Sequence, residues 1–173
     1  MAVADASPVP VIIYNVPGRT GLNMTAATTL RLAHATPKIV AIKEACGNIE
    51  QMQAILDGRP EDFLVLSGDD GITVELVKRG GDGVISVAAN AFPERFCGCV
   101  HNAMKGNIAL AESEMAELTP AIDLLFKEGN PTGVKAMTAA MGITHPEVRL
   151  PLVEGTENLA ADIKSAIARY ELK

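Results

Sequence analysis

The stretch Lys38–Lys43 (KIVAIK) decides the fold class, because a short run almost continuous in Ile, Val and Ala is typical of a strand in a buried parallel sheet. Similar apolar runs occur at Val9–Val16 (VPVIIYNV), Phe63–Leu66 (FLVL) and Gly83–Val87 (GVISV). They recur with a period of roughly 20 to 30 residues, with helical spacing between them. We therefore predict an α/β fold with four parallel strands near residues 10–15, 38–43, 63–67 and 83–87, and helices packed outside them.

The segments between these runs carry helix signals. Asn48 is a predicted N-cap, with Gln51 three residues later in the capping-box position. The next helix is expected to begin at Asp69 or Asp70 and to end at Gly80-Gly81. The segment Thr25–His34 is a weaker candidate, because it contains three threonines.

After Val87 the pattern becomes helical throughout. The predicted helices are Phe92–Lys105, Ile108–Phe126, Thr132–Met141 and Thr156–Tyr170. We expect Pro120 to kink or split the second of them. The last has one apolar stripe, formed by Leu159, Ile163, Ala166, Ile167 and Tyr170. These patterns predict a strand–helix region over residues 1–91 and a helical region over residues 92–173.

Composition excludes several classes of function. The 173 residues are 48% apolar, which is enough for a sizeable core, and the net charge is −6. An acidic chain without a basic run is a poor binder of nucleic acid or of an anionic membrane surface. The sequence shows no run of about 18 apolar residues and no signal-peptide pattern. Three cysteines are too few for a disulfide framework, so we expect a cytoplasmic protein.

Polar residues follow each apolar run, at the strand ends where ligands bind in parallel α/β folds. They are Tyr14-Asn15, Lys43-Glu44, Ser67-Gly68-Asp69-Asp70, and Ser86 with Asn90. This repetition predicts a site at the carboxyl edge of the sheet.

Lys43 has two interpretations. Against apolar walls its amine would be held neutral by desolvation, and a neutral amine attacks carbonyl groups to form a Schiff base. Alternatively, the side chain reaches solvent or forms an ion pair with Glu44. The pattern of residues alone favours the second interpretation.

Two neighbours are similarly ambiguous. Tyr14 can transfer a proton through its phenol or simply pack with its hydroxyl satisfied. Arg19, in the turn-rich loop after Asn15, can hold a carboxylate with two hydrogen bonds or remain a solvated surface charge. From these residues alone, a packed Tyr14 and a solvated Arg19 are the favoured interpretations.

No metal or nucleotide site is predicted. Asp69-Asp70 is better explained as a helix N-cap than as a metal ligand pair. Cys97 and Cys99 would point to different faces of a helix, and the three histidines lack ligand spacing. Neither Gly-rich nucleotide-binding motif occurs in the sequence.

Taken together, the motifs resemble those of the dihydrodipicolinate synthase family. They are, in order, Tyr14-Asn15-Val16-Pro17-Gly18-Arg19-Thr20-Gly21, Ile42-Lys43-Glu44-Ala45, Ser67-Gly68-Asp69-Asp70, Gly83-Val84-Ile85-Ser86-Val87, Asn130-Pro131, Val134-Lys135 and Arg149-Leu150-Pro151. The resemblance implies a (β/α)8 barrel followed by a helical domain. It also implies that this chain carries the last four strands and the helical domain, since a complete barrel takes about 250 residues.

The resemblance also implies a reaction and a role for individual residues. The family condenses pyruvate with aspartate semialdehyde in lysine biosynthesis, through a Schiff base and without a metal or cofactor. Lys43 matches the Schiff-base lysine and Tyr14 the tyrosine of the proton relay. Arg19 matches the arginine that holds the carboxylate of the second substrate. Ile85 matches the position at which the family contacts pyruvate through the main chain, and Gly68 matches the position beside it.

Two alternatives stay open beside this assignment. One is another pyruvate-dependent aldolase of the sialic-acid lyase type, although that branch generally lacks an arginine at the position of Arg19. The other is an inactive half-barrel that pairs with another subunit, because the resemblance implies that a Gly-Thr-Thr-Gly-Glu loop and a tyrosine from across the dimer interface are absent. Open strand edges and an uncovered barrel interior predict a homo-oligomer.

Overall fold

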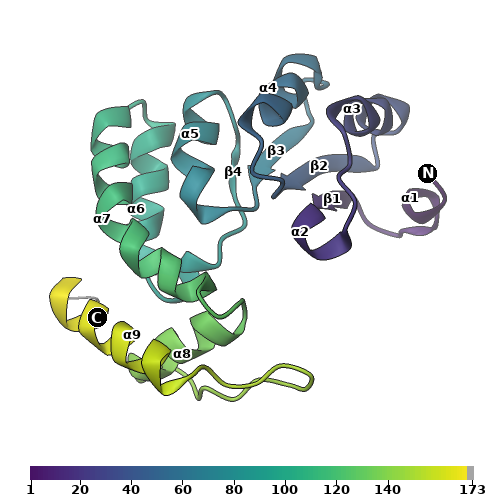
Figure 1. Cartoon of the computed structure of the whole chain (residues 1–173). Coiled ribbons are helices and arrows are strands. Elements are labelled where there is room, and N and C mark those ends of the chain that lie inside the picture. Colours follow the sequence, from purple (N-terminus) through teal and green to yellow (C-terminus); the bar gives the residue numbers. More distant parts are fainter. Residues whose placement is uncertain (171–173) are drawn as a thin grey trace. The chain divides into compact units, whose positions relative to one another are not determined.

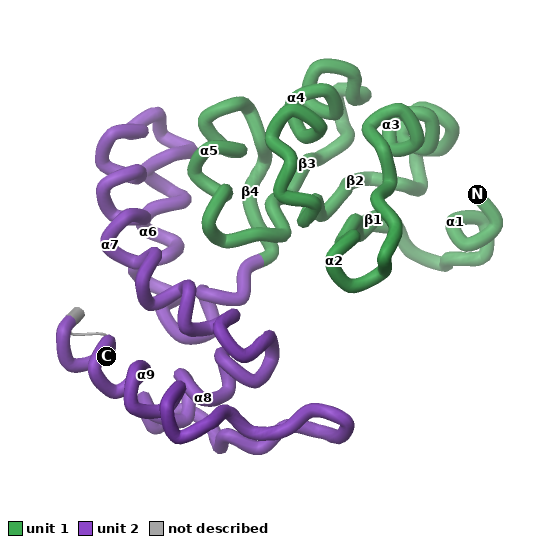
Figure 2. The backbone as a smooth tube through the Cα atoms, viewed as in Figure 1, with its two compact units in different colours: residues 1–85 green, residues 86–173 purple. Residues whose placement is uncertain are grey.

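Four strands, within residues 1–170 that the computed structural model describes, form one parallel sheet in sequence order (Figure 1). They are β1 (Val11–Asn15), β2 (Ile39–Glu44), β3 (Leu64–Ser67) and β4 (Gly83–Val84). All three neighbouring pairs are parallel, which confirms the prediction from the apolar runs. The chain divides into two compact units, residues 1–85 and residues from Ser86 onward (Figure 2), whereas the sequence placed the boundary after residue 91.

The fourth strand is shorter than the predicted 83–87. The nitrogen of Ile85 still donates to the carbonyl of Ser67, at 3.0 Å, but pairing goes no further. Ser86 then accepts a hydrogen bond from the nitrogen of Ala89, at 2.9 Å, and the chain enters the 3-10 helix η2 (Ala88–Asn90). A serine whose hydroxyl accepts from the backbone three residues ahead favours a turn over a strand. The apolar run therefore overestimated the length of the fourth strand.

Helices of the first unit cover one face of the sheet. They are α1 (Ala2–Ala6), α3 (Ala26–Ala35), α4 (Ile49–Gly58) and α5 (Thr73–Lys78), with η1 (Asp70–Ile72) before α5. The short helix α2 (Pro17–Thr20) follows the end of β1 and has no buried residue. Thr25 caps α3 and Asn48 caps α4 through their side chains, the second as predicted. A Cβ at Gly58 would lie 2.7 Å from Leu30 Cδ1, so the Leu30 side chain of α3 packs directly against the end of α4.

The two faces of the sheet differ in exposure. On the face covered by helices, Ile42 and Val65 are fully buried and pack with Met52 and Ile55 of α4. On the other face, Ile12, Leu64 and the Tyr14 side chain keep 48%, 43% and 47% of their surface exposed. Strand alternation therefore puts the predicted site residues Tyr14 and Lys43 on the uncovered face.

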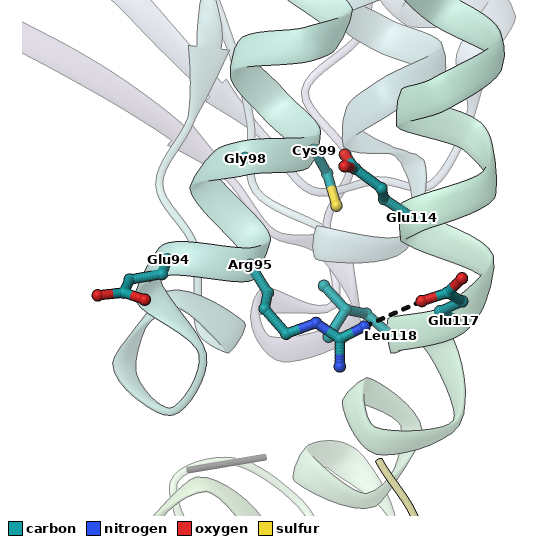
Figure 3. Close-up of a pocket in the computed structure, with 7 residues that line it drawn as sticks. All are labelled: Glu94, Arg95, Gly98, Cys99, Glu114, Glu117 and Leu118. Atoms are coloured by element: carbon teal, nitrogen blue, oxygen red, sulfur yellow. Dashed lines mark hydrogen bonds and ion pairs between the residues drawn. The ribbon is translucent and has the colours of Figure 1, made fainter. Parts of the chain in front are cut away.

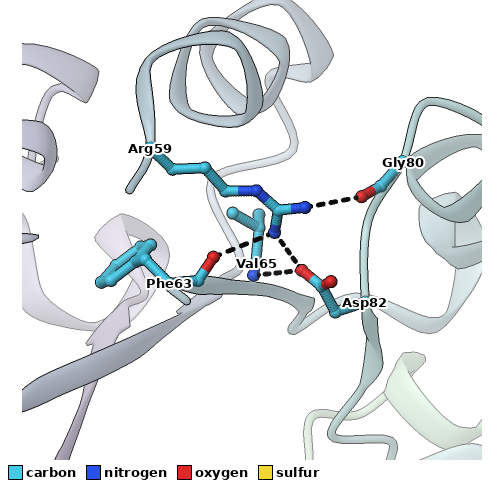
Figure 4. Close-up of polar contacts among 5 residues, drawn as sticks. All are labelled: Arg59, Phe63, Val65, Gly80 and Asp82. Carbon is cyan, nitrogen blue, oxygen red and sulfur yellow. Dashed lines mark hydrogen bonds and ion pairs between the residues drawn. The ribbon is translucent and has the colours of Figure 1, made fainter. Parts of the chain in front are cut away.

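An ion pair between Arg59 and Asp82, at the amino ends of β3 and β4, fixes β3 against the start of β4 (Figure 4). Asp82 accepts hydrogen bonds from the nitrogen of Val65, at 2.7 Å, and from Arg59. Arg59 also donates to the carbonyls of Phe63 and Gly80, at 3.1 and 3.2 Å. One guanidinium thus joins the end of α4 to both strands.

The second unit is built from α6 (Pro93–Met104), α7 (Ile108–Phe126), α8 (Thr132–Ala140) and α9 (Glu157–Tyr170), as predicted. Its core contains Phe96, Leu118, Leu125, Met137, Leu159 and Ile163. The stripe on α9 is confirmed at Leu159, Ile163 and Ala166, whereas the side chain of Tyr170 lies outside the described part.

Pro120 does not split α7, which runs unbroken for 19 residues. Proline removes one backbone N–H from the helix, but Leu118, Ala121 and Ile122 are buried on both sides of it. Burial of this apolar face outweighs the lost hydrogen bond, so the prediction of a split is wrong.

Candidate active site

Tyr14 and Lys43 lie directly opposite each other at the carboxyl ends of β1 and β2. The ammonium nitrogen of Lys43 is 4.2 Å from the centroid of the Tyr14 ring. This cation–π contact holds the amine over the aromatic face on the uncovered side of the sheet. Tyr14 and Lys43 are therefore neighbours in the fold, although 28 residues lie between them in the chain.

Gly68 and Ile85 continue this row of residues along the next two strands. The nitrogen of Gly68 donates to the carbonyl of Glu44, at 2.7 Å, directly beyond the end of β3. A Cβ at Gly68 would lie 3.1 Å from Lys43 Cε, so the glycine borders the lysine stem. Ile85 follows β4 and leaves 43% of its surface exposed. All four predicted residues thus come from the carboxyl ends of adjacent strands.

Arg19 follows the same end of β1. The predicted loop contains a single helical turn, α2, which begins at Pro17 and ends at Thr20, and its C-cap Gly21 has the left-handed conformation, φ +71°. Proline at the first turn and glycine at the C-cap explain why so short a helix is stable here. Arg19 is exposed on this turn, on the chain that leaves the site.

The burial of Glu44 was not apparent from the sequence. It is fully buried and lies on the covered face, because consecutive strand residues alternate between faces. It therefore does not take the place proposed for it as an ion-pair partner of Lys43. Its carboxylate accepts hydrogen bonds from Asn15 Nδ2 (2.8 and 3.0 Å), the nitrogen of Cys46 (2.9 Å) and Gln51 Nε2 (3.1 Å). The period-2 pattern of the strand was the signal that could have found it.

Asp69 serves as a cap, as the sequence indicated. Its carboxylate accepts a hydrogen bond from the nitrogen of Gly71, at 2.9 Å, at the start of η1. The hydroxyl of Ser67 donates to the carbonyl of Asp69, at 2.6 Å, and tightens the turn after β3. Among residues 1–170, no group of three or more His, Cys, Asp or Glu side chains lies close enough to hold a metal ion.

A cavity of about 330 Å3 lies in the second unit, between α6 and α7 (Figure 3). It is lined by Glu94, Arg95, Gly98, Cys99, Glu114, Glu117 and Leu118. Arg95 and Glu117 form an ion pair across it, at 3.0 Å. Burial and the nearby Glu114 raise the pKa of the Cys99 thiol to about 11, so this thiol is a poor nucleophile at neutral pH.

The family follows from comparison with known proteins. A model of the dihydrodipicolinate synthetase family matches residues 1–170. The chain belongs to this family. It is 53% identical, over 152 residues, to the 4-hydroxy-tetrahydrodipicolinate synthase of Phocaeicola vulgatus, and the match covers 88% of this chain and 51% of that protein.

Solved structures of family members share the fold. The dihydrodipicolinate synthase of Thermotoga maritima superimposes with a TM-score of 0.96 at 34% identity, over 99% of this chain and 59% of that one. The enzyme of Acinetobacter baumannii, solved with pyruvate, gives a TM-score of 0.94 at 34% identity, with the same coverage. The chain therefore spans somewhat over half the length of these family members. Its four strands and their helices form half of a (β/α)8 barrel, followed by the helical region.

None of the helices described for this family member is long and apolar enough to cross a membrane.

Proposed function

We propose that this chain carries the Schiff-base lysine of a 4-hydroxy-tetrahydrodipicolinate synthase, and that the lysine is Lys43. The observation that supports this most strongly is the position of the Lys43 amine over the Tyr14 ring, at the carboxyl end of a parallel sheet in a member of this family. The partners in the reaction are pyruvate and aspartate semialdehyde. The curated relatives that match this chain are named for the same activity.

The proposed chemistry uses the amine as a nucleophile. The neutral Lys43 amine attacks the keto carbon of pyruvate, water leaves, and an iminium ion forms. The iminium withdraws electrons from the adjacent methyl group, which loses a proton to give an enamine. The enamine then attacks the aldehyde carbon of aspartate semialdehyde, and a new carbon–carbon bond forms.

Neighbouring groups assist each step in this proposal. The Tyr14 hydroxyl passes protons to and from the reacting atoms. The backbone at Ile85 and Gly68 lines the pyruvate site, and Arg19 binds the carboxylate of aspartate semialdehyde with two hydrogen bonds. A charged clamp at Arg19 favours an acidic aldehyde over the neutral sugar aldehyde of a sialic-acid lyase. Three cysteines without a disulfide suit a cytoplasmic enzyme.

Schiff-base formation and condensation are separable in this chain. Formation of the Schiff base needs an accessible amine, and Lys43 is only half-buried. Condensation needs a complete proton relay and a closed pocket, to which the rest of a barrel contributes. We therefore expect slow Schiff-base formation by this chain alone and condensation at or below the detection limit.

Reductive trapping tests the proposal. The chain is incubated with pyruvate and borohydride, and the modified residue is located by mass spectrometry after proteolysis. We expect the label on Lys43, its loss in Lys43→Arg, and its retention in the matched surface variant Lys78→Arg. A label spread evenly over the lysines, or retained in Lys43→Arg, would refute the assignment.

Condensation by the chain alone is measured separately with aspartate semialdehyde as the aldehyde. Rapid turnover would show that the remaining half of a barrel is dispensable. Absence of any label in a folded sample would instead favour the alternative of an inactive half-barrel.

A further inference from the structure

Glu44 is a buried carboxylate whose hydrogen-bond partners are neutral. Both oxygens accept from Asn15 Nδ2, one also from the nitrogen of Cys46 and the other from Gln51 Nε2. Every partner is a donor, which is the arrangement that suits an ionised carboxylate. Burying a carboxylate among neutral groups costs stability, so its presence beside the candidate site calls for a physical explanation.

The network around Glu44 joins four segments of the first unit. Asn15 ends β1, and its amide oxygen accepts from the nitrogen of Met24, at 3.0 Å, in the loop before α3. Gln51 belongs to α4, and its side chain exchanges a hydrogen bond of 2.8 Å with Asn23 of the same loop. The end of β2 is thereby tied to β1, to this loop and to the first turn of α4.

This network lies one residue beyond the pair formed by Tyr14 and Lys43. Asn15 is opposite Glu44 in the register, just as Tyr14 is opposite Lys43. Because side chains alternate, Asn15 and Glu44 lie on the covered face while Tyr14 and Lys43 lie on the uncovered face. We call the two hydrogen bonds from Asn15 Nδ2 to the Glu44 carboxylate the clamp. A clamp at this place fixes the register of the two strands where the amine meets the ring.

The backbone of the same two residues strengthens this link. The carbonyl of Asn15 accepts from the nitrogen of Ala45, at 2.9 Å, and the carbonyl of Glu44 accepts from the nitrogen of Gly68, at 2.7 Å. Gly68 in turn borders the Lys43 stem, with an ideal Cβ position 3.1 Å from Lys43 Cε. Displacement of Glu44 therefore changes the surroundings of Lys43 from two sides.

We infer that Glu44, clamped by Asn15, is a positioning residue that holds the Lys43 amine over the Tyr14 ring from the opposite face of the sheet. The importance of Glu44 for catalysis rests on the proposed function. Its effect on the position of the Lys43 amine does not depend on that function. Loss of the clamp releases the strand ends, and the amine leaves its position over the ring without any change to Tyr14 or Lys43 themselves.

The test is a nuclear magnetic resonance measurement on Glu44→Gln, which keeps the size of the side chain and removes the acceptor charge. Protons of the Lys43 ε-methylene near the face of the Tyr14 ring are shifted upfield by its ring current. Lysine-labelled protein gives this signal, and its absence in Lys43→Arg identifies it. We expect the upfield shift to be lost in Glu44→Gln and kept in Glu50→Gln, which removes an equal charge from the exposed face of α4.

A second variant covers the case in which Glu44→Gln does not fold. Asn15→Ala removes the opposite half of the clamp and leaves Gln51 and the nitrogen of Cys46 on Glu44. A purely structural role would lower the unfolding temperature while leaving the Lys43 signal in place. An unchanged upfield shift in either variant, with the chain folded by circular dichroism, would overturn the inference.

Reductive trapping with pyruvate separates this inference from the proposed function. If both hold, the rate of labelling at Lys43 falls about tenfold or more in Glu44→Gln, because small displacements of a reacting group are costly. If the wild-type chain is not labelled at all, the proposed function fails, and the ring-current measurement still decides the role of Glu44.

Discussion

Gly68 leaves the space that the Lys43 side chain occupies. A methyl group at Gly68 would lie 3.1 Å from Lys43 Cε, 3.1 Å from the Glu44 carbonyl oxygen and 2.7 Å from Ala45 Cβ. The last two atoms belong to backbone or to a short side chain that cannot rotate away. A side chain here would displace either the strand end or the amine, so the proposed position of the Lys43 amine requires a glycine at residue 68.

Gly68→Ala tests this requirement. We expect a loss of about 1–3 kcal/mol in the free energy of unfolding, which is typical of overpacking, measured by urea denaturation. Labelling of Lys43 by pyruvate and borohydride should slow in the same variant. Gly18→Ala is the matched control, because an added Cβ there has no neighbour within 4 Å and the residue lies in the helical turn α2. Equal behaviour of the two variants would contradict the steric argument.

The Arg59–Asp82 ion pair gives a prediction about stability alone. Arg59→Leu removes three hydrogen bonds and leaves the Asp82 carboxylate only the nitrogen of Val65 among the contacts described above. The side chains of Arg59 and Asp82 are only 20% and 25% exposed. We therefore expect Arg59→Leu to lower the free energy of unfolding by about 1–3 kcal/mol, measured by urea denaturation.

The control for this variant is Arg79→Leu. Arg79 forms an ion pair with Glu75 on the surface of α5, and such exposed pairs contribute about 0–1 kcal/mol. If Arg59→Leu costs no more than Arg79→Leu, the ion pair of Arg59 does not hold β3 and β4 together.

The strands and the polar residues at their carboxyl ends were predictable, because both depend on short-range patterns, whereas the roles proposed for these residues came from the family resemblance. Apolar runs that end in polar residues located β1, β2 and β3 and directed attention to Tyr14, Lys43 and Gly68. The end of β4 was not predictable from hydrophobicity, since the hydrogen bond that the Ser86 hydroxyl accepts from the nitrogen of Ala89 decides it. The importance of Glu44 depends on partners in three other segments, which no local pattern brings together.

Gln51 illustrates the same limit. Its spacing from Asn48 predicted a reciprocal capping box, and Asn48 does cap α4, accepting from the Gln51 nitrogen at 2.9 Å. The Gln51 side chain, however, donates to Glu44, at 3.1 Å. A reciprocal capping box needs the Gln51 side-chain oxygen to accept from the nitrogen of Asn48. That oxygen instead accepts from Asn23 Nδ2, at 2.8 Å, so tertiary contacts override the local motif.

Thiol alkylation provides a pH-dependent prediction. Burial raises the pKa of both the Cys46 and Cys99 thiols to about 11, with Glu44 and Glu114 adding to the effect. Since the thiolate is the nucleophile, both should react slowly with iodoacetamide at pH 8 and about tenfold faster for each added pH unit below 11. Exposed Cys97 should react first, as followed by mass spectrometry.

The same shift makes stability depend on pH. A thiol whose pKa is raised by folding favours the folded state while it is protonated. This contribution is fully present below about pH 9 and is lost as the pH rises toward 11. Cys46→Ser should reduce the loss of stability between pH 9 and 11, measured by urea unfolding. An unchanged pH dependence would contradict the assigned shift.

The uncovered face of the sheet predicts self-association of this chain. Ile12, Leu64 and Ile85 keep 43% to 48% of their surface exposed in the first unit, and β1 and β4 form the edges of the sheet. Exposed apolar surface beside open strand edges favours pairing with another chain, so we expect oligomers in sedimentation at micromolar concentration. Ile12→Glu places a charge on this face and should shift the distribution toward monomer. Leu150→Glu changes a residue of the second unit that is 88% exposed, and it should leave the distribution unaltered. A well-dispersed wild-type monomer, or an equal effect of the two variants, would show that this face does not drive association.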